Sequence, residues 1–372
     1  MIPAFRPTFT TKSMMAIGKK IRQVLESGQL TLGPHTRIFE QMFANYVGRK
    51  DCVAVSSGHA ALEAILRAYG IKNREVIVPT NTNFATAAAI IESGGRIRFA
   101  DGDIELSASE VERLINTNTA GVIVVHIGGI VGSSMMKIRE ICDRANIFLL
   151  EDASHAHGSE LFGTKAGALG HAAAFSMFAT KVITSGEGGC VVTNDEDLLK
   201  TVRMLRDQGK DPSSGQHILE GGSWRMSEIH AIIGASQLSQ IDRFISRRRQ
   251  ILRRYGELLK AAHPHLSLVA GSKVSLPSGY KCIVRVNESV STAELKQRIA
   301  EDKQICLGSG VYDIPLHVQP VFKMWSGQDT FPEAIQFCSN HLCLPIWSHM
   351  KDEEVDRVSD YILDVTFRAA KK

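Results

Sequence analysis

The stretch EDASHAHGSELFGTKAGALGHAAAFSMFATKVITSGEGGCVVTND, residues 151–195, holds the features that decide the fold. Within it Lys181 stands between a short apolar run, AAAFS (172–176), and a Gly-Glu-Gly-Gly turn that leads into GCVVT (189–193). A solvated lysine needs no such setting, but an amine that must be aimed at an electrophilic carbon does. We therefore expect two strands, with a lysine-bearing loop between them.

Similar apolar runs recur on the N-terminal side of this stretch. They are CVAVSS from residue 52, EVIVP from 75, RIRFA from 96, GVIVVHI from 121 and IFLLED from 147. Most are separated by segments of helical periodicity, such as HAALEAILRAYG (59–70) and MMKIREICDRA (135–145). Buried strands that alternate with helices are typical of a mainly parallel sheet covered on both faces.

The pattern changes from Met226 onward. Residues 227–262 predict one long helix or a broken pair, with Ser227 as the capping residue. After about residue 270, short strands such as KCIVRV (281–286) mix with helices such as TAELKQRIAED (292–302). We expect an N-terminal arm (1–12), a large domain (13–245) and a smaller C-terminal α/β domain (246–372).

The composition is that of a soluble globular protein of 372 residues, with 44% hydrophobic and 22% charged residues and a net charge of +4. Arginines 247–249, 253 and 254 are expected on one helix face, solvated or at an interface, so no nucleic-acid partner is predicted.

The seven cysteines are scattered, without CxxC pairs or Cys/His clusters. This spacing predicts neither a disulfide framework nor a metal site. The N-terminus lacks an apolar signal-peptide core, and the longest apolar stretch (120–132) is too short and glycine-rich to span a bilayer. We therefore expect a cytoplasmic enzyme or binding protein with no membrane partner.

Two features would suit a phosphorylated ligand with a charged ring. In VSSGHAALEAIL (55–66) a strand meets a helix at Ser57, and the N–H groups of Gly58, His59 and Ala60 would suit a phosphate. In LLEDASHAHG (149–158) an apolar run ends in Glu151-Asp152, where a carboxylate could pair with a cationic ring nitrogen, and His155 follows closely.

Two further features would suit an aldehyde and a planar ring. Ser176 and Lys181 bracket a loop before a glycine-rich turn, and lysine suits Schiff-base chemistry when its pKa is lowered. In VPTNTNFATAAAI (78–90) Phe84 follows a strand end, where it could stack on a cofactor.

Taken singly, each feature has an ordinary explanation. The Ser57 turn is a common strand-to-helix turn, Asp152 could cap a helix beside a solvated histidine, Lys181 could be a surface residue, and Phe84 could belong to the core. Together they supply a phosphate cradle, a stacking aromatic, a carboxylate for a pyridine nitrogen and an amine. Those are the requirements of pyridoxal 5′-phosphate (PLP).

The chain resembles the DegT/DnrJ/EryC1/StrS family of sugar aminotransferases. The resemblance runs from GQLTLGPHTRIFEQMFANYVG (28–48) to LPIWSHMKDEEVDRVSDYI (344–362), and its most specific part is the block 151–195. It implies the aspartate-aminotransferase type of PLP fold (type I), with a mainly parallel seven-stranded sheet in the large domain.

The resemblance also implies roles for individual residues. Lys181 would form the Schiff base with PLP and move the proton during catalysis, with pyridoxamine 5′-phosphate as the intermediate cofactor form. Asp152 would hold the pyridinium proton, and His155 would lie beneath the ring. Lys165 lies in a variable loop and is not the expected Schiff-base lysine. The expected phosphate ligands are Ser57, Gly58, His59 and Ser176, and Phe84 would stack on the ring.

Two positions depart from the family pattern. Ser223 stands where the family usually has an asparagine that reaches the partner subunit's phosphate in a homodimer with shared sites. A serine can still donate a hydrogen bond, although it is shorter. His59 replaces a threonine or another small residue, so its side chain either touches the phosphate or points away.

We expect an aminotransferase that moves an amino group from glutamate or glutamine to a keto sugar in amino-sugar biosynthesis. The expected acceptor is nucleotide-linked, with a sugar phosphate or a cyclitol as alternatives. A deoxysugar dehydratase of the same family would carry histidine in place of Lys181, and a non-catalytic PLP-fold protein need not keep Lys181, Asp152 and Ser176 together.

Overall fold

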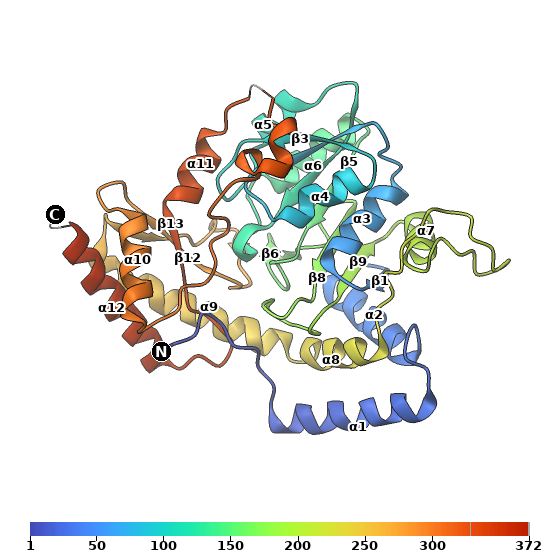
Figure 1. The fold of residues 1–372 in the computed structure, drawn as a ribbon, viewed down its shortest axis with the longest axis horizontal. Coiled ribbons are helices and arrows are strands. Elements are labelled where there is room, and N and C mark those ends of the chain that lie inside the picture. The colour runs from blue at the N-terminus through green and yellow to red at the C-terminus, as the bar shows by residue number, and fades with distance from the viewer. Residues whose placement is uncertain (328, 371–372) are drawn as a thin grey trace.

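The protein, described here from a computed structural model over residues 1–327 and 329–370, is built around a seven-stranded sheet (Figure 1). Its strands, in spatial order, are β1 (Asp51–Val55), β9 (Gly189–Thr193), β8 (Ala172–Ser176), β5 (Phe148–Asp152), β4 (Thr119–Val125), β2 (Glu75–Pro79) and β3 (Arg96–Ala100). β9 is antiparallel to both of its neighbours, and the other adjacent pairs are parallel. The mainly parallel seven-stranded sheet is thus confirmed.

Helices cover both faces of this sheet because successive residues of each buried strand point to opposite sides. On β1, for example, Cys52 and Ala54 join one core, and Val53 and Val55 join the other. The first core contains α2 (Pro34–Val47), α5 (Ala108–Leu114), α6 (Met135–Arg144) and α8 (Glu228–Leu238). The second contains α3 (Gly58–Ala68), α4 (Phe84–Glu92) and α7 (Glu196–Arg206).

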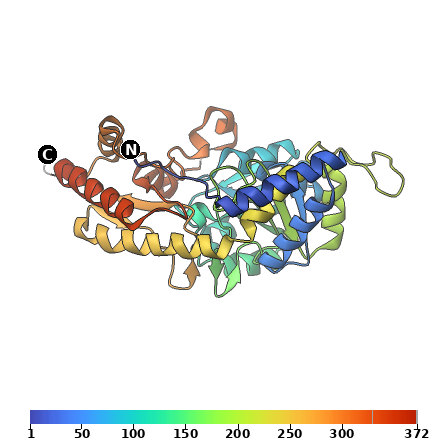
Figure 2. The same ribbon diagram turned by 90° about the horizontal axis from the view of Figure 1, so that it is seen from below.

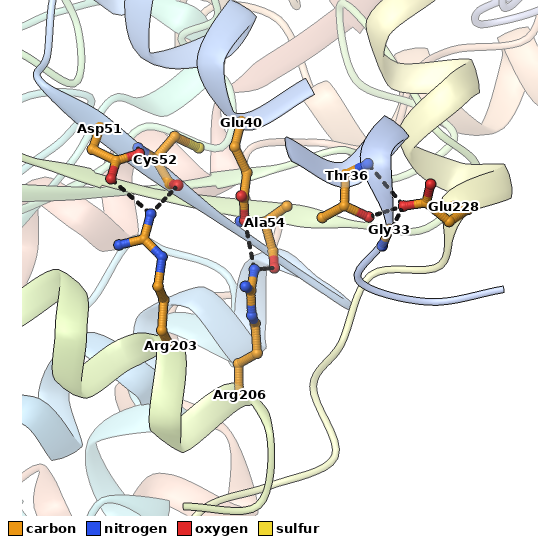
Figure 3. A network of polar contacts seen from close by, with 9 residues as sticks. All are labelled: Gly33, Thr36, Glu40, Asp51, Cys52, Ala54, Arg203, Arg206 and Glu228. Carbon is orange, nitrogen blue, oxygen red and sulfur yellow. Dashed lines mark hydrogen bonds and ion pairs between the residues drawn. The ribbon is translucent and has the colours of Figure 1, made fainter. Parts of the chain in front are cut away.

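The N-terminal helix α1 (Thr11–Ser27) lies along α8 at the edge of the large domain (Figures 1 and 2). A buried carboxylate ties the start of the next helix, α2, to α8. Glu228 is fully buried and accepts hydrogen bonds from the backbone N–H groups of Gly33, His35 and Thr36 at 2.8–2.9 Å. Figure 3 shows its contacts with Gly33 and Thr36. Because the N-cap residue Gly33 has no side chain, Glu228 takes the place of an N-cap for α2.

A second polar cluster fixes β1 between α2 and α7 (Figure 3). Arg206 donates to Glu40 at 2.5 Å and to the Ala54 carbonyl at 2.8 Å, and Glu40 accepts from the Ala54 N–H at 2.8 Å. Arg203 pairs with Asp51 at 2.7 Å. These contacts hold the strand that leads into the Ser57 turn.

The predicted long helix is a broken pair, α8 and α9 (Ile241–Leu258), and Ser227 caps the first as expected. α9 leads from the large sheet to a smaller core (Figure 1). That core holds the sheet β10 (Leu266–Leu268), β12 (Cys282–Val286) and β13 (His341–Leu344), with helices α10 (Thr292–Asp302) and α12 (Asp352–Ala370). A third sheet joins β11 (Ser275–Leu276), β6 (Glu160–Leu161) and β7 (Thr164–Lys165).

The division into domains at residues 12 and 245 stays a prediction, and two segments pack across it. Ile2 is buried in the small core, and its N–H donates to Gln304 O at 2.9 Å. Side chains between Val311 and Phe337 join the second core of the large sheet. That region includes α11 (Pro332–Ser339) and the 3₁₀ turns Leu316–Val318 and Pro320–Trp325. Elsewhere in the chain, Ile127–Gly129 and Leu259–Ala262 also form 3₁₀ turns.

The expectation of a solvated or interface face for the basic run of α9 is wrong. Consecutive helical residues are about 100° apart, so Arg247, Arg248 and Arg249 cannot share a face. Arg248 is buried and donates to Ser348 Oγ at 3.1 Å and to Gly279 O at 3.0 Å. Arg247 reaches Met350 O, and Arg249 reaches Pro277 O. The run joins α9 to surrounding loops.

All seven cysteines are free, and six of them are buried. Within the described residues, no helix combines the length and apolar character that crossing a membrane requires.

Candidate active site

A cavity of about 280 Å³ lies at the carboxyl edge of the large sheet. Seven of the nine predicted site residues line it: Ser57, Gly58, His59, Asp152, His155, Ser176 and Lys181. They come from the ends of β1, β5 and β8 and from the loops that follow. The sheet therefore brings together groups that are more than 120 positions apart in the sequence.

One end of the cavity is formed where α3 begins. The Ser57 hydroxyl accepts from the Ala60 N–H at 3.0 Å, while the N–H groups of Gly58 and His59 belong to the first turn, which lacks intrahelical partners. Gly58 is pressed against Ser176, because a Cβ at position 58 would lie 2.7 Å from Ser176 Cβ. Backbone donors, a hydroxyl and the helix dipole converge here, which fits a phosphate.

The side chain of His59 turns to another partner at this end. Its Nε2 lies 2.7 Å from Glu92 Oε2. Among the described residues His59, Glu63 and Glu92 are the one group whose ligand atoms lie close enough together to hold a metal ion. Glu63 is already paired with Arg67 at 2.7 Å, so ion pairs account for the cluster.

Asp152 ends β5 with its carboxylate held in a fixed position. Thr86 Oγ1 donates to Oδ2 at 2.7 Å, and the Ser154 N–H donates to Oδ1 at 3.1 Å. Asp152 is buried yet lines the cavity, so its carboxylate can accept a further hydrogen bond, from a ligand in the cavity. Its neighbour Glu151 points into the core instead, where it accepts from the N–H groups of Gly167, Leu169 and Gly170 and contacts His126.

Lys181 is held on a short loop between β8 and β9. Its N–H donates to Phe178 O at 3.0 Å, and the loop is closed by the Met177 N–H donating to Gly188 O at 2.8 Å. Gly186 and Gly188 have φ values of 87° and 153°, which favour glycine, so the glycine-rich turn has its expected role.

The environment of the Lys181 amine makes it a good nucleophile. Burial lowers the pKa of Lys181 to about 8, with a further lowering from Lys281 and an opposing effect of Asp152. Its Nζ lies 5.0 Å from the centroid of the Tyr280 ring. A lysine with a lowered pKa is partly neutral near pH 8, as attack on a carbonyl carbon requires.

His155 is a neutral, packed group. Its ring stacks on Tyr280 with centroids 4.2 Å apart, and its Nδ1 accepts from the Gly128 N–H at 3.3 Å. Burial, together with the cations of Lys181 and Lys281, lowers its pKa well below the usual value for histidine. His155 can therefore present a flat apolar face to a ligand.

Two predicted residues do not line this cavity. The Phe84 ring is 52% exposed and packs against Phe322, with centroids 5.5 Å apart, although its neighbours Asn83 and Ala85 do line the cavity. Stacking of Phe84 on a ligand would require its ring to turn from Phe322, and it stays a prediction. Ser223 is exposed and accepts from Arg225 at 2.7 Å.

Lys165, which is not the expected Schiff-base lysine, lies outside this cavity. Its Nζ is 4.9 Å from the centroid of the Tyr46 ring, and it is not among the cavity residues.

Several lining residues were missed. Thr86 lies two residues after Phe84, and a polar side chain at the start of an apolar helix could have indicated a site residue. Glu187 lies inside the glycine-rich turn and could have been named with it. Tyr312 had no signal, since it reaches the cavity from the C-terminal part through a hydrogen bond from its N–H to Asn81 Oδ1 at 3.0 Å.

Comparison with known proteins agrees with this geometry. Residues 13–363 match the DegT/DnrJ/EryC1/StrS aminotransferase family. The dTDP-3-amino-3,6-dideoxy-alpha-D-galactopyranose transaminase of Aneurinibacillus thermoaerophilus is 34% identical over 351 residues, which cover 93% of this chain and 94% of that protein.

Solved structures give the same result. DesV of S. venezuelae superposes with a TM-score of 0.90 at 30% identity, covering 100% of this chain and 99% of the other. The PLP form of Spr1654 from Streptococcus pneumoniae gives a TM-score of 0.89 at 25% identity, with 99% of each chain covered.

Proposed function

Because this chain belongs to the DegT/DnrJ/EryC1/StrS aminotransferase family and is a PLP-dependent sugar aminotransferase, we propose that it moves an amino group from glutamate or glutamine to a nucleotide-linked keto sugar. The observation that carries the proposal is the meeting of Lys181, Asp152 and the Gly58 turn in one cavity. The cavity supplies the amine, the carboxylate and the phosphate donors that PLP requires, so the residues present fit this cofactor.

Bound PLP supplies an aldehyde carbon and a conjugated ring that accepts an electron pair. In the proposed site Lys181 Nζ would hold the cofactor through its aldehyde carbon and would carry a proton as general base and acid. Asp152 would keep the proton on the pyridine nitrogen, and Thr86 and Ser154 hold its carboxylate in place. Ser57, Gly58, His59 and Ser176 would hold the phosphate, and His155 would support the ring.

The nucleotide-linked acceptor is supported by the relative from Aneurinibacillus thermoaerophilus, whose name describes a dTDP-linked amino sugar. Sugar phosphates and cyclitols remain the alternatives. A dehydratase of this family is not favoured, because residue 181 is lysine and not the histidine of that branch. A non-catalytic protein is not favoured either, because Lys181, Asp152 and Ser176 line one cavity.

We also propose a cytoplasmic homodimer with shared sites. The apolar side chains of Met14, Met15 and Leu25 on α1 are each more than half exposed, which supports a further surface packing on this helix. Ser223 lies on an exposed segment and is free to reach a partner subunit. The seven free cysteines suit a reducing compartment.

The test of the function separates the two halves of the reaction. The purified holoenzyme should change its visible absorbance when glutamate or glutamine is added, and the amino form should then aminate a keto sugar. A panel of dTDP-, GDP- and UDP-linked keto sugars, a keto sugar phosphate and an inosose identifies the acceptor. Lys181→Ala should abolish both halves, whereas Lys165→Ala should retain them. Normal transamination by Lys181→Ala would contradict the assignment.

The shared site is tested with two inactive variants. Lys181→Ala and a bulky charged substitution, Ser223→Glu, are co-expressed with different tags, and the mixed dimers are isolated. One site of each mixed dimer then carries both an intact Lys181 and an intact Ser223, so part of the activity should return. Mixed dimers without activity, or an active monomer, would contradict a shared site.

A further inference from the structure

A second lysine, Lys281, lies against the same aromatic ring as Lys181. The Nζ atoms of Lys181 and Lys281 are 5.0 Å and 5.4 Å from the centroid of the Tyr280 ring. Both distances are within the range in which a cation interacts with an aromatic ring. Two lysine amines therefore lie near one buried tyrosine ring, which also stacks on His155.

The amine of Lys281 is anchored by neutral groups. Its Nζ donates to Ser309 O at 3.0 Å and to Ser309 Oγ at 3.3 Å. Over the described parts of the chain, no carboxylate lies within 4.0 Å of this amine, and Asp313, the nearby acid, is paired with Lys296 at 2.6 Å. Burial lowers the pKa of Lys281, and Cys343 and Asp313 oppose this lowering. In its protonated form the Lys281 amine is thus held in position by Ser309, with no carboxylate in contact.

Lys181 has a different surrounding. Within the described residues its amine makes no hydrogen bond and no ion pair, so the Tyr280 ring is its one close partner that favours the protonated form. Burial is the largest cause of its lowered pKa, the Asp152 carboxylate opposes it, and the charge of Lys281 lowers it further. A nearby like charge disfavours protonation because both ammonium groups share a medium of low dielectric constant.

We propose that Lys281 is a positioning residue whose anchored charge, placed against the same Tyr280 ring, favours the neutral, reactive form of the Lys181 amine. The inference rests on the proposed role of Lys181. Lys281 itself contacts no reacting atom in this scheme. Lys281 acts through its charge alone. It lies immediately before β12, in the C-terminal part of the chain.

Other charged and titratable groups also face Lys181. Four of them share its cavity: Asp152, His155, Glu187 and Tyr312. His157 interacts with Lys181 electrostatically, and the Tyr280 ring lies near its amine. Arg6 and Arg248 line a narrow space beside Lys181. Burial keeps His155 and His157 neutral by lowering their pKa, and burial raises the pKa of both tyrosines. These groups are the same in every variant below, so they form a constant background.

The test compares a neutral and a charged replacement of Lys281. Lys281→Gln removes the charge but keeps a donor for Ser309, and Lys281→Arg keeps the charge. Lys165→Gln is the matched control, because Lys165 also lies over a tyrosine ring but outside the cavity. The first readout is the pH at which the visible absorbance of the holoenzyme changes. The second is labelling of the Lys181 amine by an amine-specific reagent, followed by mass spectrometry of the cofactor-free protein.

The sign of the expected change follows from the charge. Without the Lys281 ammonium, protonation of the Lys181 nitrogen is less disfavoured, so Lys281→Gln should raise both midpoints. The labelling rate at pH 7 should then fall. Lys281→Arg should restore the wild-type midpoints, and Lys165→Gln should leave them unchanged.

Three outcomes would overturn the inference: unchanged midpoints in Lys281→Gln, equal shifts in the Gln and Arg variants, or a shift in Lys165→Gln. If Lys281→Gln does not fold, Lys281→Met supplies a neutral side chain of similar length with the same expected shift. Failure of the proposed function would look different, since wild-type protein would then show no visible cofactor absorbance and no response to glutamate.

Discussion

Replacing Gly58 by alanine should damage the phosphate end of the cavity selectively. The added Cβ would lie 2.7 Å from Ser176 Cβ and 3.1 Å from Ser176 Cα, whereas carbon atoms in contact are normally about 3.5–4.0 Å apart. Because the nearest atoms belong to the backbone and a short side chain, the Ser57–His59 turn must move away from Ser176 by roughly 1 Å. Forced overpacking of this kind typically costs about 1–3 kcal/mol.

The expected loss of PLP affinity follows from that cost. If the displaced turn loses its alignment with the phosphate, about 1–3 kcal/mol corresponds to roughly 5- to 150-fold weaker binding. The loss of folding stability should be partly offset, since alanine in a helix is favoured over glycine by about 0.5–1 kcal/mol. The free energy of PLP binding should therefore change more than the free energy of unfolding.

The assay titrates cofactor-free protein with PLP and, separately, with pyridoxal, which lacks the phosphate. Gly58→Ala should weaken the binding of PLP but leave that of pyridoxal nearly unchanged. Gly18→Ala is the control, because a Cβ at this position of α1 meets nothing within 4 Å. Equal losses for PLP and pyridoxal, or no loss for either, would refute the phosphate cradle.

Two further substitutions test other parts of the structure. Asp152→Asn should retain PLP yet lose most transamination, because an amide does not keep the ring nitrogen protonated; activity within a few-fold of wild type, measured in a coupled glutamate assay, would contradict this role. Glu228→Gln should lower the free energy of unfolding by about 2–4 kcal/mol in urea titrations, since a buried carboxylate with several N–H donors is lost. Burial raises the pKa of Glu228, but hydrogen bonds from Thr36, His35 and Gly33 outweigh it and hold the pKa below 4.5. This stabilisation is complete above the unfolded-state pKa and disappears as the pH falls through the folded-state value; a wild-type-like acid transition in Glu228→Gln would count against it.

The sheet could be predicted because its strands are buried on both faces. EVIVP, RIRFA, AAAFS and GCVVT coincide with β2, β3, β8 and β9 at both ends. A parallel sheet places its ligand at the carboxyl edge, so Asp152 and the Ser57 turn could be assigned before their distances were known. The family resemblance then distinguished Lys181 from Lys165, which the local pattern alone leaves open.

The contacts of Arg248 and Arg249 on α9 could not be predicted, because most of their acceptors are backbone carbonyls. Arg248 and Arg249 donate to Gly279 O and Pro277 O, and carbonyl groups leave no trace in the sequence pattern. Three adjacent arginines are usually solvated, and here the tertiary structure overrides that tendency. The buried ends of loops supply the acceptors, which only a folded chain reveals.

The Lys181 environment was incompletely predicted for the same reason, since part of it returns from the C-terminal third of the chain. Tyr280 and Lys281 approach because the N–H of Ser278 donates to Gly129 O at 3.1 Å, and Tyr312 approaches because the N–H of Leu316 donates to Thr80 O at 2.8 Å. Both anchors are backbone bonds to loops at the carboxyl edge of the large sheet. The loops of the large sheet therefore supply the reacting amine and the carboxylate, while the later segments set the charge and the aromatic surface around them. Substitutions after residue 275 can then change the reactivity of Lys181 without altering any group expected to bind PLP directly.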